Sequence, residues 1–210
     1  MIELDKIYNM DCLDGMKMIP DGSIDLIVTD PPYKITPRGN AGNSGGMMQK
    51  KLSMEGRIFN HNDIEIEDYL QEFYRVLKDG THCYIMCNQI NLVHFLKVID
   101  DSDFHFVKSL IWDKVSPLMG RYYMSRFEYI LFLRKGRDKS INECGTPDIL
   151  TFLNSKPKDK NGDNLHDSAK PVPLFQVLIK NSCEKVMSFL TLLWVAEPQP
   201  LLALGKSVIS

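Results

Sequence analysis

Short apolar runs alternate along this chain with segments in which apolar residues recur every three or four positions. The short runs are typical of buried strands, and the periodic segments are typical of helices with one buried face. Strands are predicted over residues 24–28, 81–87, 104–112 and 127–134, and helices over residues 63–80, 89–99 and 171–182. This alternation predicts a mixed α/β domain with a largely parallel sheet, in which the last two strands could pair antiparallel.

The first of these helices has the clearest predicted boundaries. Asp63 can cap its start, and Lys78–Gly80 is expected to end it. Its buried face would carry Ile66, Leu70, Phe73 and Leu77. Pro171 suits the first position of the last helix, where the missing N–H of proline is not needed.

Two polar segments interrupt the pattern. Residues 35–60 contain five glycines together with asparagines and basic residues, which predicts a long mobile loop. Residues 135–170 are polar and rich in lysine, which predicts an insertion or a small subdomain outside the core. The lysines there are either a solvated surface or a contact for nucleic acid.

Composition limits the class of protein. The 210 residues are 44% hydrophobic, which is enough for one globular domain over residues 1–210. The formal net charge is −2, so binding to phosphates would need a local basic patch. The amino terminus lacks the pattern of a secretory signal, and no apolar run approaches the ~20 residues of a membrane span. A cytoplasmic protein without membrane contact is therefore expected.

Five cysteines are scattered along the chain, namely Cys12, Cys83, Cys87, Cys144 and Cys183. They are expected to be small core residues in a reducing compartment. A metal site would need a second close pair besides Cys83 and Cys87, so no metal is expected.

The strongest chemical signal is the tetrapeptide Asp30-Pro31-Pro32-Tyr33, which follows the apolar strand 24–28. Proline has no N–H for a sheet ladder, so the strand must end there. Ligands of α/β sheets bind beyond the carboxyl ends of the strands, so the tetrapeptide is expected at the mouth of a cleft. An ordinary turn that ends a strand is the alternative.

This tetrapeptide suits a reaction at the exocyclic amino group of adenine, whose nitrogen is a poor nucleophile because its lone pair is conjugated with the ring. The Asp30 carboxylate and the Pro31 carbonyl can each accept one amino hydrogen, which localises the lone pair. Tyr33 offers a flat face for the base, and such stacking contributes ~1–3 kcal/mol per base. The base would have to leave the duplex to reach this pocket.

Further segments extend the resemblance to a known family. They are Ile7–Leu13, Ile19–Val28, Tyr74–Gly80, Ile111–Lys114, Phe127–Leu131 and His166–Pro171. With these segments, over residues 1 to about 185, the chain resembles the permuted, site-specific DNA methyltransferases that modify amino groups of adenine or cytosine. It looks most like the phage and prophage adenine members, and a link to restriction–modification is expected, although the sequence leaves the existence of a partner nuclease open.

The resemblance implies the Rossmann-like sheet of S-adenosylmethionine-dependent methyltransferases, with helices on both faces and an altered C-terminal part. It also implies methyl transfer from S-adenosylmethionine to adenine in double-stranded DNA, with the target base flipped out. Asp30, Pro31, Pro32 and Tyr33 would be catalytic, and Asp11, Asp30, Lys170 and Pro171 would line the cofactor pocket. The segments 35–60 and 135–170 would contact DNA, and a homodimer is left open.

Each of these roles has a structural alternative. Asp11 could be a helix cap, and Lys170 could be a surface lysine at a helix start. Trp112 is expected in the core rather than at a base. Asp113 and Lys114 could pair with each other at the surface, where an ion pair contributes little.

The resemblance breaks after residue 185. The family has a strand there, then Asp-Pro-Phe and a glycine-rich turn that lets the backbone approach the cofactor. Residues 186–200 contain neither motif, and Ala169 replaces the polar residue that often precedes Lys-Pro. Val186–Val195 is apolar enough for a central strand, so the fold is expected to survive in part. Trp194 stands where a small residue is needed, which predicts weak or absent cofactor binding.

A slip of one nucleotide could explain the break. Codons chosen for Val186–Glu197 and read one nucleotide earlier can encode Gly-Asp-Val-Val-Leu-Asp-Pro-Phe-Met-Gly-Ser-Gly, the missing motif. The tail Ala203–Ile209 again looks like family sequence, so a nucleotide lost near Lys185 and one gained near Leu201 would account for both. Sequencing the gene tests this hypothesis, which is wrong if no shift of one nucleotide yields the motif.

Three functional interpretations follow. The chain is an active DNA amino-methyltransferase, with adenine favoured over cytosine, or a catalytically dead remnant that still binds DNA. The third interpretation is a methyltransferase for another planar amino or amide group, in protein or RNA. The glycine-rich loop and the basic insertion favour DNA.

Overall fold

The computed structural model describes residues 6–8, 10–31, 64–118, 122–154, 170–183, 186–193 and 201–208. Of residues 6–7, 186–193 and 201–208 it describes the backbone only. The predicted loop over residues 35–60 lies outside the described residues, as do Asp63 and most of the second half of the polar segment 135–170.

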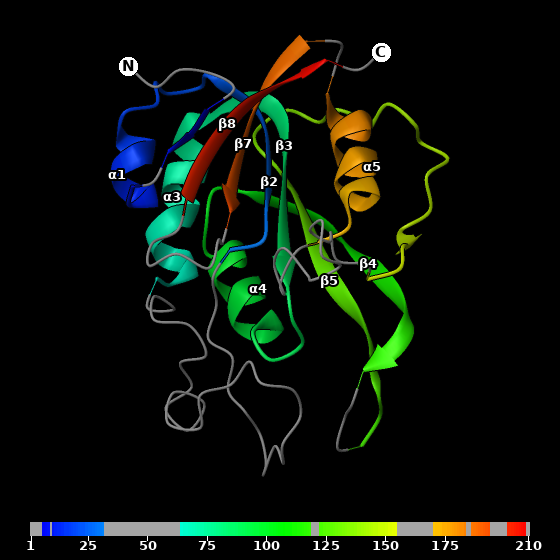
Figure 1. Cartoon of the computed structure of the whole chain (residues 1–210). Helices are drawn as coiled ribbons and strands as arrows, with labels where there is room; N and C mark the ends of the chain where they lie inside the picture. Colours follow the sequence, from blue (N-terminus) through cyan, green and yellow to red (C-terminus); the bar gives the residue numbers. More distant parts are fainter. Residues whose placement is uncertain are drawn as a thin grey trace, which may run out of the picture.

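In the described part of the chain, eight strands form one sheet that is covered by helices (Figure 1). The strands are β1 (Lys6–Tyr8), β2 (Ile24–Thr29), β3 (Leu77–Cys87), β4 (His105–Leu118), β5 (Ser125–Arg134), β6 (Ile149–Thr151), β7 (Val186–Leu193) and β8 (Leu201–Val208). The helices are α1 (Cys12–Lys17), α3 (Ile66–Val76), α4 (Leu92–Asp100) and α5 (Val172–Ser182). Each strand and helix predicted from the apolar pattern is present, with shifted boundaries.

The sheet is mixed, with the strand order β1-β8-β7-β2-β3-β5-β4-β6. β2 runs parallel to both β3 and β7, and β4 runs parallel to β6. The pairings β3–β5, β4–β5, β7–β8 and β1–β8 are antiparallel. The α/β fold class is therefore confirmed, and so is the antiparallel pairing suggested for β4 and β5. The expectation of a largely parallel sheet is wrong, because β3–β5, β7–β8 and β1–β8 are antiparallel as well.

Helices cover both faces of the sheet, as predicted (Figure 1). α1, α3 and α4 pack on one face, where the buried side chains include Met16, Phe73 and Phe95. α5 packs on the other face, where Leu174 lies in one apolar cluster with Trp112. Two apolar layers, one on each side of the sheet, therefore hold the domain together.

The boundary between α3 and β3 differs from the prediction. α3 ends directly where β3 begins, at Leu77, so the prediction that Lys78–Gly80 ends the helix is wrong. These residues instead extend β3, because Leu77 pairs with Ile24 of β2. At the start of α3, Glu65 and Asp68 form a reciprocal capping box.

The cysteines are all free. Cys12, Cys83, Cys87 and Cys183 are buried, which confirms the expectation of core residues, whereas Cys144 is exposed and contradicts it. Among the helices of the described ranges, none combines the length and the apolar character needed to cross a bilayer.

The carboxyl ends of several strands meet at one edge of the sheet, which we call the carboxyl edge. β2, β3 and β7 are parallel, and β4 has the same direction because β5 is antiparallel to both β3 and β4. Asp30 follows β2 at this edge, and Leu193 and Leu201, the paired ends of β7 and β8, also lie there.

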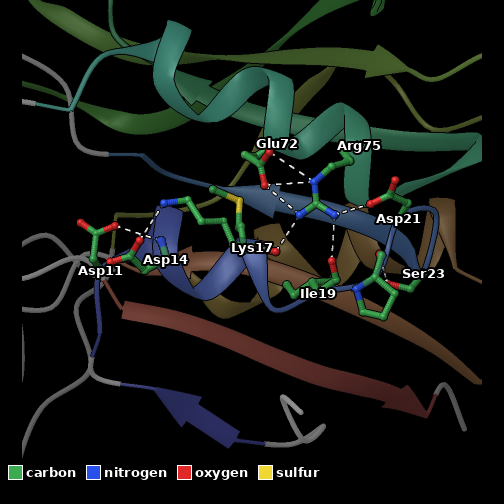
Figure 2. A network of polar contacts seen from close by, with 10 residues as sticks. Asp11, Asp14, Lys17, Ile19, Asp21, Ser23, Glu72 and Arg75 are labelled. Carbon is green, nitrogen blue, oxygen red and sulfur yellow. Dashed lines mark hydrogen bonds and ion pairs between the residues drawn. The ribbon is translucent and has the colours of Figure 1, made fainter.

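Arg75, near the end of α3, ties this helix to the turn between α1 and β2 (Figure 2). Its guanidinium donates hydrogen bonds to the main-chain carbonyls of Ile19 at 2.9 Å and Met16 at 2.8 Å. It also donates to the carboxylates of Asp21 at 2.5 Å and Glu72 at 2.8 Å. A planar group with several donors can satisfy these four acceptors together, which the single ammonium of lysine cannot.

We expect Arg75→Ala to lower the free energy of unfolding by about 2 kcal/mol, because it leaves two partly buried carbonyls without a charged donor. For a domain of this size that change lowers the melting temperature by roughly 4–8 °C. Thermal unfolding followed by circular dichroism measures it. Lys17→Ala is the matched control, because Lys17 forms an exposed ion pair with Asp14, and an effect of equal size in both variants would contradict the prediction.

Candidate functional site

The carboxylate of Asp30 is held at the carboxyl edge through one of its two oxygens. Oδ2 accepts a hydrogen bond from Lys170 Nζ at 2.5 Å. Oδ1 is buried and has no hydrogen-bond partner among the described residues. A buried acceptor left unsatisfied costs roughly 1–3 kcal/mol or more when it is charged. A ligand that donates an N–H to Oδ1 would offset this cost.

Prolines help to place both members of this pair. β2 ends at Thr29, and Pro31 removes the N–H that a longer strand would need. Pro171 is the N-cap of α5, so the helix begins at Val172, one residue after the predicted first position. α5 packs against β2 and β3 and so brings Lys170 next to Asp30, although 140 residues separate them. The alternative that Lys170 is only a surface lysine is therefore wrong.

The rest of the predicted catalytic tetrapeptide is only partly described. Pro31 is buried beside the end of β2. Pro32 and Tyr33 lie outside the described residues, so their catalytic roles stay predictions.

A second ion pair lies next to the first. Glu128 Oε1 accepts a hydrogen bond from Lys114 Nζ at 2.5 Å. Glu128 Oε2 lies 3.9 Å from Lys170 Nζ and, within the described ranges, is a buried oxygen without a hydrogen bond. Lys114, Glu128, Lys170 and Asp30 thus form a row of alternating charges. Two acceptor oxygens in this row, one on each carboxylate, have the capacity to receive donors from a ligand.

The electrostatics of the row follow from its burial. Burial raises the pKa of the Asp30 carboxyl; the Lys170 ammonium opposes this rise, and the like charge of Glu128 adds to it. For Lys170, burial alone lowers the pKa, but the carboxylates of Asp30 and Glu128 outweigh burial and leave its pKa raised. Lys170 therefore stays protonated, and the charge on Asp30 depends on the donors that surround it.

Glu128 and Lys114 were not among the site residues that the sequence predicted. The alternative that Asp113 pairs with Lys114 is wrong, because Asp113 accepts two hydrogen bonds of 2.7 Å from Arg126. Neighbouring residues of a strand point to opposite faces, so Lys114 turns inward while Asp113 turns outward. Trp112 is 1% exposed, which confirms the core position. The signal that could have located Glu128 is a lone carboxylate within an apolar strand.

Asp11 follows β1 and caps α1 (Figure 2). Its Oδ1 accepts hydrogen bonds from the main-chain N–H groups of Leu13 at 2.9 Å and Asp14 at 3.1 Å. The interpretation of Asp11 as a helix cap is thus confirmed. Its predicted contact with a cofactor remains a prediction, because one carboxylate can cap a helix and bind a ligand.

Solved structures of DNA methyltransferases share this fold. The PvuII DNA methyltransferase, which is cytosine-N4-specific, superposes with a TM-score of 0.63 and 16% identity over 88% of this chain and 72% of that one. M1.HpyAVI in complex with S-adenosylmethionine gives a TM-score of 0.60 and 16% identity over 89% of this chain and 80% of that one. At identities this low the superpositions establish the fold alone, which the chain shares with these two DNA methyltransferases.

The chain belongs to the N6/N4 DNA methylase family, because the family model, described as DNA methylase, matches residues 24–187. It is 26% identical to the type II methyltransferase M.HinfI of Haemophilus influenzae, over 85% of this chain and 56% of that protein. It is 25% identical to M2.MboI of Moraxella bovis, over 85% of this chain and 71% of that protein. The chain thus spans little more than half the length of M.HinfI. The family match ends close to the point where the sequence departs from the family pattern.

We expect Glu128→Gln to lower the pKa of Asp30, because the substitution removes a like charge that faces this carboxyl group. A titration of the carboxyl carbon of Asp30 by ¹³C NMR, assigned with Asp30→Asn, measures the change. Glu143→Gln is the control, because it removes a carboxylate from an exposed pair with Lys180. An Asp30 pKa that is the same in wild type and Glu128→Gln would contradict the proposed row of charges.

Proposed function

We propose that this chain is a site-specific DNA methyltransferase that transfers a methyl group from S-adenosylmethionine to the exocyclic amino group of adenine. The observation that carries the proposal is the arrangement of the Asp30 carboxylate, of which one oxygen is fixed by Lys170 and the other is buried and has no hydrogen-bond partner within the described ranges. Oδ1 accepts one amino hydrogen of the target base, and the main-chain carbonyl of Pro31 accepts the other. The nitrogen then moves toward tetrahedral geometry and its lone pair becomes available for methylation.

The target base reaches this carboxylate only outside the duplex. Tyr33 supplies a face on which the extruded base stacks, and the segments 35–60 and 135–170 contact double-stranded DNA. Membership in the N6/N4 DNA methylase family supports DNA as the substrate over protein or RNA. The resemblance of the sequence to adenine enzymes supports adenine, whereas the cytosine-N4 specificity of the PvuII enzyme supports cytosine as the second candidate.

The residues present suit the cofactor only in part. By the resemblance, Asp11 and the segment Lys170–Pro171 would line the pocket for S-adenosylmethionine, and the similar M1.HpyAVI structure is a complex with this cofactor. However, β7 is followed by β8, its antiparallel neighbour, and residues 194–200 between them contain no glycine. We therefore propose that this chain binds S-adenosylmethionine weakly. That feature favours a second candidate function, a DNA-binding protein with little methylation activity.

Methylation of cellular DNA tests the reaction. A restored chain, in which residues 186–197 are replaced by Gly-Asp-Val-Val-Leu-Asp-Pro-Phe-Met-Gly-Ser-Gly, should add N6-methyladenine to the DNA of a host without its own methyltransferases. Asp30→Asn in the restored chain should lower the methylation rate by about 10²-fold or more, because it replaces the charged acceptor of the amino hydrogen with a neutral amide. Mass spectrometry of the nucleosides measures both.

The control for this experiment is Asp103→Asn in the restored chain, because Asp103 is exposed in the turn between α4 and β4, away from the carboxyl edge. It should leave methylation unchanged. Detection of N4-methylcytosine in place of N6-methyladenine would show that the target base is cytosine. A folded restored chain that methylates neither base would refute the proposed function.

Calorimetry tests the cofactor. The native chain should show little or no heat of binding with S-adenosylmethionine, because the turn that would approach the cofactor has no glycine. The restored chain should bind it. Micromolar affinity in the native chain would overturn the proposal of weak binding and favour an active enzyme.

A further inference from the structure

β4 and β5 continue as a two-stranded hairpin past the end of the neighbouring strand. β3 ends at Cys87, which pairs with Tyr129 of β5. The ladder between β4 and β5 goes on beyond this level as far as the pair Leu118–Ser125. The four residue steps from Tyr129 to Ser125 extend about 13 Å. Figure 1 shows the hairpin projecting away from the helices at the carboxyl edge.

The described end of this hairpin carries exposed aromatic and apolar side chains, which we call the aromatic tip. Its members are Tyr122, Tyr123, Met124 and Phe127. Tyr123 is 93% exposed and Tyr122 is 86% exposed. Aromatic rings are costly to leave in water and are enriched where a protein binds a partner. The tip therefore has the character of a contact surface.

Asp113 and Arg126 brace the hairpin below the tip. Arg126 donates two hydrogen bonds of 2.7 Å to the Asp113 carboxylate, whose Oδ1 also accepts one from the Val115 N–H at 2.9 Å. Val115 has a φ of +68°, which a β-branched residue rarely adopts. Strained backbone of this kind persists only where its surroundings hold it. The brace thus fixes the direction in which the hairpin leaves the sheet.

The base of the hairpin is continuous with the candidate site. Glu128 of β5 lies 3.9 Å from Lys170 Nζ, and Lys170 holds Asp30. Tyr123 stands only a few residues along the chain from Glu128. A DNA strand that presents a base to Asp30 would therefore pass along this hairpin.

We propose that the aromatic tip, and Tyr123 in particular, stacks on the exposed faces of the DNA bases that flank the target base. The proposal rests on the proposed function, because extrusion of one base leaves its neighbours with an open face. An aromatic ring can stack on that exposed face whichever of the bases presents it. Arg126 is neutralised by Asp113, so the brace below the tip has no net charge to attract phosphates. Base faces, rather than the phosphate backbone, are the matching partner.

Binding to single-stranded DNA tests the tip. Fluorescence anisotropy would compare a labelled single strand of mixed sequence with a strand of equal length made of abasic sites, which keeps the phosphates and lacks the bases. The wild-type chain should prefer the strand with bases. Tyr123→Ala should weaken binding to that strand by about tenfold, as expected for one lost stacking contact, and leave binding to the abasic strand unchanged.

Two variants serve as controls. Tyr123→Phe keeps the ring and should bind both strands as the wild type does. Phe106→Ala removes a partly exposed ring from the other end of β4, where Phe106 pairs with Leu133, and should also keep the preference for bases. Thermal unfolding of each variant checks that the fold is intact.

Other outcomes overturn the proposal. An equal loss on both strands after Tyr123→Ala would mean that the tip contacts the backbone. Wild-type affinity in Tyr123→Ala would mean that the tip does not touch DNA, and a dimer that dissociates in this variant would mean that the tip binds a second copy. A base preference that depends on Tyr123 in a chain without methylation would leave this inference standing while the proposed function fails.

Discussion

The ion pair between Lys170 and Asp30 is the interaction on which the carboxyl edge depends. It joins the start of α5 to the end of β2, 140 residues apart in the chain. A buried ion pair adds little net stability, because the loss of hydration offsets the attraction. Two apolar side chains would hold α5 on the sheet at least as well. The pair is better explained by the oxygen that it leaves open, which points in a fixed direction and has no partner among the described residues.

Local chemistry explains why part of this site could be predicted from the sequence. An apolar run that ends in Asp-Pro-Pro predicts both the end of β2 and the place of Asp30, because proline cannot continue the ladder. Glu128 and Lys114 could not be predicted in the same way. Their pairing depends on how far β4 and β5 extend, and β4 continues to Leu118, well past the predicted end at residue 112. Only the observed register places Glu128 opposite Trp112 and next to Lys170.

Apart from the antiparallel pair of β4 and β5, which the sequence suggested, the directions of the strands could not be predicted. An apolar run predicts that a strand is buried, but it does not say which neighbour it meets or in which direction. Gly80 shows the same limit on a smaller scale. Its φ of +73° would suit a helix end as well as an irregular strand. The pairing of Leu77 with Ile24 shows that Gly80 belongs to the strand. Tertiary pairing therefore overrides the local signal at the junction of α3 and β3.

The two halves of the site depend on different parts of the sheet. Asp30, Glu128 and Lys170 are placed by β2, β5 and α5, all within the residues that match the family. β7 needs only an extended backbone to pair with β2, where Leu26 meets Phe189 and Ile27 meets Leu190. An apolar segment can therefore complete the sheet without rebuilding the glycine-rich turn. A shifted reading frame in this region would therefore abolish cofactor binding while leaving the fold in place. Such a chain would keep its contacts with DNA and lose methylation.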